Sequence, residues 1–192
     1  MDFKKNGVYE NMPELIGVSG GPTKPEIIAV SLFKLDIKDG DVFADVGCGT
    51  GLISIEATRL AKNLKIYAMD ARDVAVDAAT QNFKNFGIEN AEVISGESSE
   101  VISNLEKVDC AFVGGTKNIT AVLDALIEKG ARSIIVNAVR IETVVRVIEH
   151  MKKRGIYDET VHIIASRSEE LTGETYFKPE NPVYIMSGKQ KQ

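Results

Sequence analysis

The sequence has no tryptophan, only two cysteines and two histidines, and no long apolar run, and each scarcity excludes a class of protein. Two cysteines cannot form the disulfide framework of a small secreted domain, which favours a reducing cytoplasm. His150 and His162 are isolated and lack the spacing of metal ligands, so no metal site is expected. No apolar stretch reaches the roughly 18 residues that cross a bilayer, and the first residues lack the apolar core of a signal peptide, so no membrane contact is expected.

Basic residues are also fewer than acidic ones. The chain carries 23 Lys and Arg against 28 Asp and Glu, for a net charge of −5. The resulting pI near 5.2 argues against a broad contact with nucleic acid. Apolar residues make up 44% of the 192 positions, which is enough for one globular domain with a sizeable core. We therefore expect a single domain over residues 1–192, in which residues 1–19 form an irregular arm.

The most informative stretch is a strand pattern followed by a glycine-rich turn. Val42–Val46 is a short, β-branched apolar run of the kind that forms a buried strand. Glycine then occupies every second position, at Gly47, Gly49 and Gly51, before a helical pattern begins at Leu52. Glycine in such a turn tolerates positive φ and lets a ligand lie on the backbone. The first turn of the following helix also offers free N–H groups to a carboxylate.

The spacing of this turn identifies its ligand class. The dinucleotide fingerprint G-x-G-x-x-G needs glycine where Leu52 stands, and the Gly-Lys-Ser/Thr of a P-loop is absent. Asp45 and the alternate glycines instead resemble the first motif of the class I S-adenosylmethionine (SAM) methyltransferases. Asp70 ends the next apolar run, 19 residues after Gly51, where its carboxylate can accept hydrogen bonds from both hydroxyls of a ribose. An ordinary α/β turn with a solvated acidic residue explains this joint spacing less well.

Strand and helix patterns alternate along the rest of the chain. Strands are expected at 42–46, 64–69, 91–94, 108–113 and 133–136, and helices at 25–36, 52–60, 74–86, 99–104, 119–129 and 141–154. Thr23 is the expected N-cap of the first helix. Thr160–Ala165 and Pro182–Ser187 flank a polar loop and should pair antiparallel at a sheet edge. The pattern predicts a Rossmann-like α/β fold with a seven-stranded, mostly parallel, doubly wound sheet and a C-terminal antiparallel hairpin.

Several segments outside the glycine turn make the resemblance more specific. They are Gly21-Pro-Thr-Lys24, Phe112-Val-Gly-Gly115, Val136-Asn-Ala-Val139, Ser166-Arg167 with Leu171-Thr-Gly173 and Thr175, and Asn181-Pro-Val-Tyr-Ile-Met-Ser-Gly188. With these, the chain resembles the decarboxylating C15-methyltransferases of cobalamin biosynthesis, the cobalt-precorrin-6B (precorrin-6Y) family. The resemblance implies SAM as cofactor and a tetrapyrrole substrate that gains a methyl group at C15 and loses carbon dioxide from the ring C acetate. It also implies a homotetramer, with a separate C5-methyltransferase as a candidate partner.

The same resemblance implies roles for individual residues. Thr23 would lie against SAM, the glycine turn would wrap its methionine end, and Asp70 would take the ribose. Gly96-Glu97-Ser98 would border the adenine, although the family usually has Gly-Asp-Ala there. The predicted cofactor-binding residues are Thr23, Gly47, Cys48, Gly49, Thr50, Gly51, Asp70 and Ser98. No catalytic base is nominated, because the sulfonium is already activated and positioning can supply most of the rate.

Four polar side chains are candidates for binding a carboxylate-rich substrate. Lys24, Asn137, Arg140 and Arg167 all fall in or beside loops at the expected carboxyl ends of strands. Arginine can clamp a carboxylate through two parallel hydrogen bonds, which favours Arg140 and Arg167. A solvated surface charge is an equal alternative for each cation, and Asn137 could bond either the substrate or the backbone. Ser168-Glu169-Glu170 replaces the second arginine of the family's S-R-G-R pattern, which weakens the case for Arg167.

Other functions are compatible with the same fold. Asn181-Pro-Val-Tyr184 resembles the N-P-P-Y motif of adenine methyltransferases, but that motif should follow the fourth strand, where Gly114-Gly115 stands. The acidic pI also disfavours a tRNA substrate. A small class I methyltransferase acting on protein would carry the same turn. Leu52 disfavours an NAD-dependent Rossmann protein, and the intact glycine turn disfavours a scaffold that has lost SAM.

Overall fold

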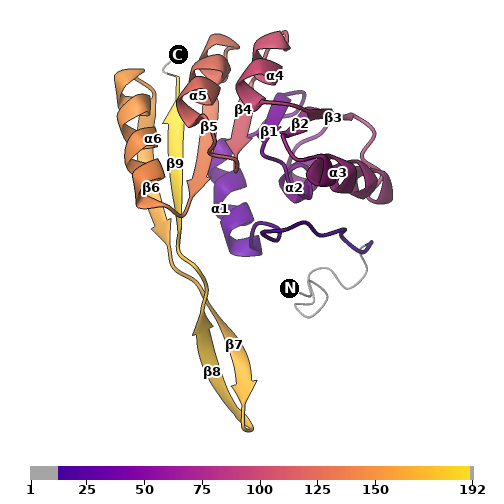
Figure 1. The fold of residues 1–192 in the computed structure, drawn as a ribbon, viewed down its shortest axis with the longest axis vertical. Coiled ribbons are helices and arrows are strands. Elements are labelled where there is room, and N and C mark those ends of the chain that lie inside the picture. Colours follow the sequence, from indigo (N-terminus) through magenta and orange to yellow (C-terminus); the bar gives the residue numbers. More distant parts are fainter. Residues whose placement is uncertain (1–12, 191–192) are drawn as a thin grey trace.

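The computed structural model of the chain describes residues 13–190, which form a seven-stranded sheet and a separate two-stranded sheet. Figure 1 shows the elements in order. The helices are α1 (Pro25–Leu35), α2 (Leu52–Leu60), α3 (Asp73–Asn85), α4 (Ser98–Asn104), α5 (Ile119–Glu128) and α6 (Ile141–Lys153). The strands are β1 (Val42–Val46), β2 (Lys65–Asp70), β3 (Ala91–Ser95), β4 (Cys110–Val113), β5 (Ser133–Ala138), β6 (Tyr157–Ile163), β7 (Ser166–Leu171), β8 (Glu174–Pro179) and β9 (Val183–Lys189).

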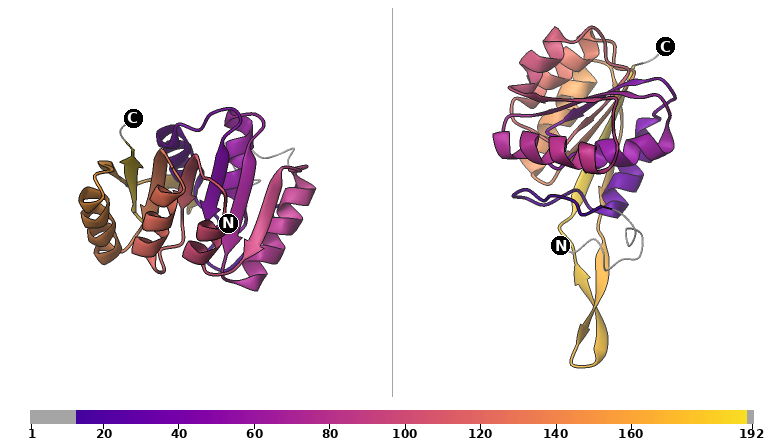
Figure 2. Two further views of the ribbon diagram at one scale, coloured as in Figure 1. Left: turned by 90° about the horizontal axis from the view of Figure 1, so that it is seen from above. Right: turned by 90° about the vertical axis from the view of Figure 1, so that its right-hand side faces the viewer.

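The large sheet has the strand order β3-β2-β1-β4-β5-β9-β6. Neighbours among β1 to β5 pair in parallel, and β9 runs antiparallel to both β5 and β6. One hydrophobic cluster packs under α1, α2 and α3 and the other under α4, α5 and α6, so helices cover both faces (Figure 2). The predicted seven-stranded Rossmann-like fold is confirmed, as is the antiparallel pairing of the last two strands of the sheet.

The central strands are buried on both faces, which is why their positions could be predicted from the sequence. Every residue of Val42–Val46 and of Cys110–Val113 is buried. Parallel strands buried on both faces need apolar side chains at nearly every position, which gives short continuous apolar runs. The strand order reverses between β1 and β4, whose residues pair from Phe43 with Cys110 to Val46 with Val113. The crevice at the carboxyl ends of these two strands is where such sheets bind ligands.

Two local predictions were wrong. The polar loop expected after Ala165 is a two-stranded hairpin, β7 and β8, that extends beyond the body of the molecule (Figures 1 and 2). Its turn uses positive φ at both Thr172 and Gly173, the geometry that matches the twist of a hairpin. Nearly every hairpin residue is exposed, so no alternation of buried and exposed positions marked the strands. The N-cap position of the first helix is Lys24 rather than Thr23, and the Lys24 side chain makes no capping hydrogen bond; Pro25 is the first residue of the helix.

Residues 13–24 contain no helix or strand, as expected for the part of the N-terminal arm that the structure describes; residues 1–12 lie outside it. No helix between residues 13 and 190 is long and apolar enough to cross a membrane.

At the end of the sheet opposite the ligand crevice, an ion pair joins the residues that precede β1 and β5. Arg132 donates to both carboxylate oxygens of Asp41, at 2.9 and 2.6 Å, and also to the carbonyl of Asp36 at the end of α1, at 2.8 Å. Arg132→Met should lower the free energy of unfolding by about 2 to 3 kcal/mol, because it leaves a nearly buried carboxylate without its cationic partner. Urea denaturation measures this. Lys38→Met, which removes an exposed partner of Asp36, is the control and should change stability by less than about 0.5 kcal/mol. Equal effects of the two variants would contradict the account.

Candidate active site

The three glycines of the turn serve different purposes. All three have positive φ, and a Cβ on Gly47 would lie 2.5 Å from the backbone nitrogen of Gly115. A Cβ on Gly51 would lie 2.5 Å from the ring of Phe83. Both glycines are therefore required by close packing within the fold. A Cβ on Gly49 would meet nothing nearer than 3.8 Å, so its partly exposed backbone is available to a ligand.

Asp70 lies at the end of β2, next to this turn, and is almost fully buried. Its Oδ2 accepts hydrogen bonds from the backbone N–H of Gly49 at 3.1 Å and from Nη2 of Arg72 at 2.9 Å. Its Oδ1 accepts from the backbone N–H and from Nε of Arg72, at 3.1 and 3.0 Å. Burial alone would raise the pKa of Asp70, but the hydrogen bonds from Arg72 and Gly49 outweigh it and lower the pKa. The carboxylate is therefore charged and rigidly placed, with two donors on each oxygen.

Asp45 is a second acidic group, and it is fully buried. Its Oδ2 accepts a hydrogen bond from Oγ of Ser54 at 2.7 Å, whereas its Oδ1 has no partner among residues 13–190. Burial raises the pKa of Asp45 to about 7, against the opposing effect of the Ser54 hydrogen bonds. A buried acceptor without a partner destabilises a protein unless a ligand supplies a donor. The sequence identified Asp45 only as part of a motif and did not predict its direct place in the site.

Two cavities adjoin at the carboxyl ends of the strands. The first, of about 260 Å³, lies over the glycine turn and is called the glycine-turn cavity. The second, of about 640 Å³, lies between the start of α1, the end of β5 and the start of β9 and is called the large cavity. The residues that line both are Gly20, Gly21, Pro22, Thr23, Phe112 and Gly114. The two cavities therefore meet at these residues, so a ligand in one can lie next to a ligand in the other.

The predicted cofactor residues fall at different distances from the glycine-turn cavity. Its lining includes Thr23, Gly47, Cys48, Gly49 and Thr50, together with Asp45. Gly51 lies behind the lining, against Phe83, and Asp70 lies behind Arg72. Ser98 lines neither cavity but begins α4, three residues beyond Ser95, the strand partner of Asp70. The structure therefore brings most of the predicted set together and leaves Ser98 at the margin.

Cys48 and Glu97 both take structural roles. Burial, followed by the nearby charges of Asp45 and Asp70, raises the pKa of the Cys48 thiol. A thiol that stays protonated is a poor nucleophile, so Cys48 is not a candidate for a covalent step. Glu97 caps α4, since its carboxylate accepts from the hydroxyl of Ser99 and from the backbone N–H of Glu100. At the position where the family usually has aspartate, the carboxylate of Glu97 is therefore already hydrogen-bonded to the start of α4.

The predicted substrate-binding residues also differ in whether they line a cavity. Lys24, Asn137 and Arg140 line the large cavity, but Arg167 does not. Arg167 instead pairs with Glu26 at 2.5 Å and with Glu180 at 3.3 Å. Asn137 donates to the hydroxyl of Ser31 at 3.0 Å, so its side chain bonds another side chain, an option that the sequence did not suggest.

Glu180 is a cavity residue that the sequence did not single out. It lines the large cavity and pairs with Lys24 at 2.8 Å, and hydrogen bonding to Lys24 lowers its pKa. The two residues are 156 positions apart, so no local pattern could have revealed the pair.

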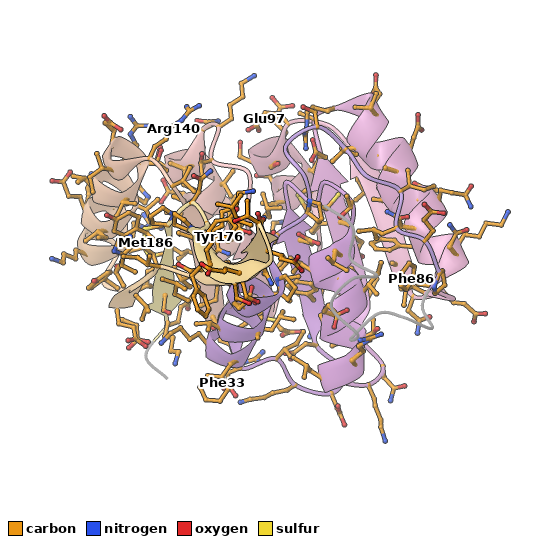
Figure 3. The ribbon with its side chains drawn as sticks, turned by 90° about the horizontal axis from the view of Figure 1, so that it is seen from below. Phe33, Phe86, Glu97, Arg140, Tyr176 and Met186 are labelled. Carbon is orange, nitrogen blue, oxygen red and sulfur yellow. The ribbon has the colours of Figure 1, made fainter. Side chains whose placement is uncertain are left out.

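Figure 3 views the molecule from the end at which the carboxyl ends of the parallel strands lie. Arg140 and Glu97 lie on the side of the sheet that α4, α5 and α6 cover, and Phe33 and Phe86 lie on the other side.

Comparison with known proteins decides between the remaining methyltransferase classes. Residues 17–190 match the family model described as the precorrin methyltransferase domain. The chain belongs to the precorrin methyltransferase family. A relative from Methanosarcina acetivorans is 66% identical over 94% of this chain and 100% of its own length. It is described as a probable cobalt-precorrin-6B C(15)-methyltransferase (decarboxylating), as is a relative from Saccharolobus solfataricus that is 35% identical over 88% of both chains.

Solved structures agree with this family. A precorrin-6y C5,15-methyltransferase from Geobacter metallireducens superposes with a TM-score of 0.85 at 28% identity, covering 92% of this chain and 95% of its own. A precorrin 8w decarboxylase from Methanobacterium thermoautotrophicum gives 0.84 at 25% identity, covering 92% and 97%. The predicted family, fold and enzyme class are therefore confirmed.

Members of the precorrin methyltransferase family use SAM, so the chain is a SAM-dependent methyltransferase. The residues of the glycine-turn cavity fit this molecule. Gly49 presents bare backbone, and Asp45 offers a buried oxygen without a partner, which suits an ammonium group. Asp70 supplies a charged carboxylate of the kind that accepts two hydroxyl donors.

Proposed function

We propose that the chain transfers a methyl group from SAM to C15 of cobalt-precorrin-6B and removes carbon dioxide from the ring C acetate, in the biosynthesis of cobalamin. The observation that carries this proposal is the 66% identity with the Methanosarcina acetivorans relative, over 94% of this chain. The two adjoining cavities support it independently. One offers the bare backbone of Gly49 and the buried carboxylate of Asp45 to a nucleoside sulfonium, and the other is more than twice as large and borders basic side chains.

When bound, SAM supplies a methyl group on an activated sulfonium. The protein supplies position: Asp45 would fix the amino group of the cofactor and Asp70 its ribose. The residues that line both cavities would hold C15 of the substrate in line with the methyl group. Phe112 contributes an apolar ring to this shared lining and excludes water from it. Exclusion of water also favours loss of the acetate carboxylate, because a carboxylate is less stable without hydration.

We propose that Lys24, Asn137 and Arg140 contact substrate carboxylates, and that Arg167 acts through Glu180. Arg140→Met should raise the KM for the tetrapyrrole by about 5- to 20-fold, because a charge-assisted contact is lost. The dissociation constant of SAM should not change. Arg146→Met is the matched control, because Arg146 is an exposed arginine on α6, the helix that follows Arg140, and lines neither cavity. An unchanged KM in the Arg140 variant would remove this residue from the substrate site.

The reaction itself is tested by incubating the protein with cobalt-precorrin-6B and methyl-labelled SAM, followed by mass spectrometry. The product should carry one labelled methyl group and lack one carbon dioxide. The metal-free substrate, incubated in parallel, reports whether cobalt is needed. A labelled product that retains all its carboxylates would contradict the decarboxylating part of the proposal, and no labelled product with either substrate would contradict the whole.

We also propose that the chain works as a homo-oligomer, a tetramer by analogy with its family, assembled through the β7–β8 hairpin. A lone two-stranded hairpin is marginally stable in water. This one has exposed apolar side chains at Leu171 and Phe177, with 61% and 70% of their surface accessible. A second copy of the same hairpin would cover them.

The compartment and a second partner are also part of the proposal. Two buried, unpaired cysteines suit a reducing cytoplasm. A separate C5-methyltransferase would be a candidate partner there.

Analytical ultracentrifugation tests this assembly. The wild-type chain of 20.9 kDa should sediment as a multiple of that mass, and as four copies if the family analogy holds. Leu171→Ser combined with Phe177→Ser should shift the distribution to smaller species, because it removes the apolar surface to be covered. Phe33→Ser, which changes an even more exposed aromatic residue on α1, should leave the mass unchanged. A wild-type protein that sediments as a single chain would contradict the proposal.

A further inference from the structure

The carboxylate of Asp70 receives four hydrogen bonds, two on each oxygen. On each oxygen one donor belongs to the backbone: the N–H of Gly49 on Oδ2 and the N–H of Arg72 on Oδ1. The other donor on each oxygen belongs to the guanidinium of Arg72, with Nη2 on Oδ2 and Nε on Oδ1. A carboxylate oxygen has two lone pairs, so all the strong acceptor positions of Asp70 are taken.

The guanidinium also lies between Asp70 and the space where a ligand would bind. Arg72 lines the glycine-turn cavity, whereas Asp70 does not. Half of the Arg72 side chain is accessible, against 6% of the Asp70 side chain. The two backbone donors are fixed by the fold, but the guanidinium is at the end of a flexible side chain and can move away.

We propose that Arg72 competes with the cofactor for Asp70 and must withdraw before the ribose can bind. Its two donors occupy one position on each oxygen, which are the positions that the two hydroxyls of a ribose need. When the guanidinium leaves, Gly49 and the backbone of Arg72 still hold the carboxylate in place. The inference rests on the proposed function only in assigning the ribose to Asp70.

Arg72 also connects the cofactor carboxylate with the segment over the cavity. Its Nη1 donates to the carbonyl of Ser19 at 3.3 Å. Residues 18–22 line the glycine-turn cavity, and the preceding Ile16 is held separately by Asn82 through two hydrogen bonds of 2.8 and 3.0 Å. Withdrawal of Arg72 therefore releases the segment at Ser19 while Asn82 keeps it anchored at Ile16.

Calorimetry with S-adenosylhomocysteine, which carries the same ribose as SAM, tests the competition. Arg72→Met should bind this ligand about 5- to 10-fold more tightly than wild type, because no charge-assisted bonds have to be broken; the half-exposed position of Arg72 keeps the effect modest. Arg72→Lys should fall between them, since an ammonium cannot span both oxygens. Arg154→Met, which removes an arginine paired with Asp124 far from the site, is the matched control and should bind as wild type does. Equal or weaker binding by Arg72→Met would overturn the proposal.

A second measurement follows the guanidinium directly and needs no catalysis. In a ¹⁵N-resolved NMR spectrum, the Nε–H signal of Arg72 is the one that Arg72→Met lacks. Saturation with S-adenosylhomocysteine should shift this signal toward that of a solvated arginine and speed its exchange with water. An unmoved signal at saturation would show that Arg72 stays on Asp70. Failure of the wild type to bind the ligand at all would overturn the cofactor assignment as well, whereas binding without tightening in Arg72→Met would overturn the competition alone.

Discussion

Gly47→Ala should lower the free energy of unfolding by about 3 to 5 kcal/mol, the largest stability effect that we expect from one methyl group in this protein. The new Cβ would lie 2.5 Å from the backbone of Gly115, and the residue would have to keep a φ of 73°. Neither backbone can move without disturbing β1 or β4, since both continue directly from buried strands. Urea denaturation of the variant measures the loss.

Gly49→Ala is the matched variant two positions away. Its Cβ would have no neighbour within 3.8 Å, so only the strain of a positive φ remains, about 1 kcal/mol. Its added methyl group enters the glycine-turn cavity, however, and should weaken SAM binding at least about tenfold, because a ligand can no longer lie on the backbone. A Gly47→Ala protein as stable as Gly49→Ala, or a Gly49→Ala protein with normal SAM affinity, would contradict the division of roles in the turn.

Asp45→Asn should make the cofactor-free protein more stable by about 2 to 4 kcal/mol above pH 7. Burial raises the pKa of Asp45 from 3.8 to about 7 in the folded protein. The folded state therefore binds a proton more tightly than the unfolded state, and this group costs stability progressively as the pH rises from about 4 to 7. The difference between the variant and wild type should thus be small near pH 4, grow up to about pH 7 and then stay constant.

The same carboxylate should control cofactor affinity in the opposite direction. If Asp45 accepts the ammonium of SAM, its ionised form binds better, so the affinity of the wild type should fall as the pH drops below 7. In Asp45→Asn the affinity should be low and lose this pH dependence. Ser54→Ala is the control, because it removes a hydrogen bond that stabilises the ionised form and should shift the transition to higher pH. An Asp45→Asn protein that is no more stable at pH 8, or binds SAM normally, would contradict the role of Asp45.

The sequence predicted the parts of the fold in which local chemistry and tertiary context agree. The run 42–46 is buried on both faces, so its composition alone identified a strand, and the glycine spacing after it identified the cofactor class. The β7–β8 hairpin was missed because exposed strands carry no buried face and its stabilising partner is not part of its own sequence.

The sequence predicted individual site residues, but not the pairs that those residues form in the structure. Asp70 was found because the end of a strand fixes its place, but Arg72 was not considered, although an arginine two residues beyond a strand-end carboxylate can fold back onto it. Arg167 was expected at the substrate, and Glu26 and Glu180 engage it instead. Such pairings join distant parts of the chain, so they follow from the fold and not from any local pattern.

A crystal structure with bound S-adenosylhomocysteine tests the central claim most directly. The account predicts the ligand in the glycine-turn cavity, with its ribose hydroxyls on Asp70, its amino group at Asp45 and the Arg72 guanidinium turned away. A ligand bound elsewhere, or a ribose that makes no contact with Asp70, would contradict it.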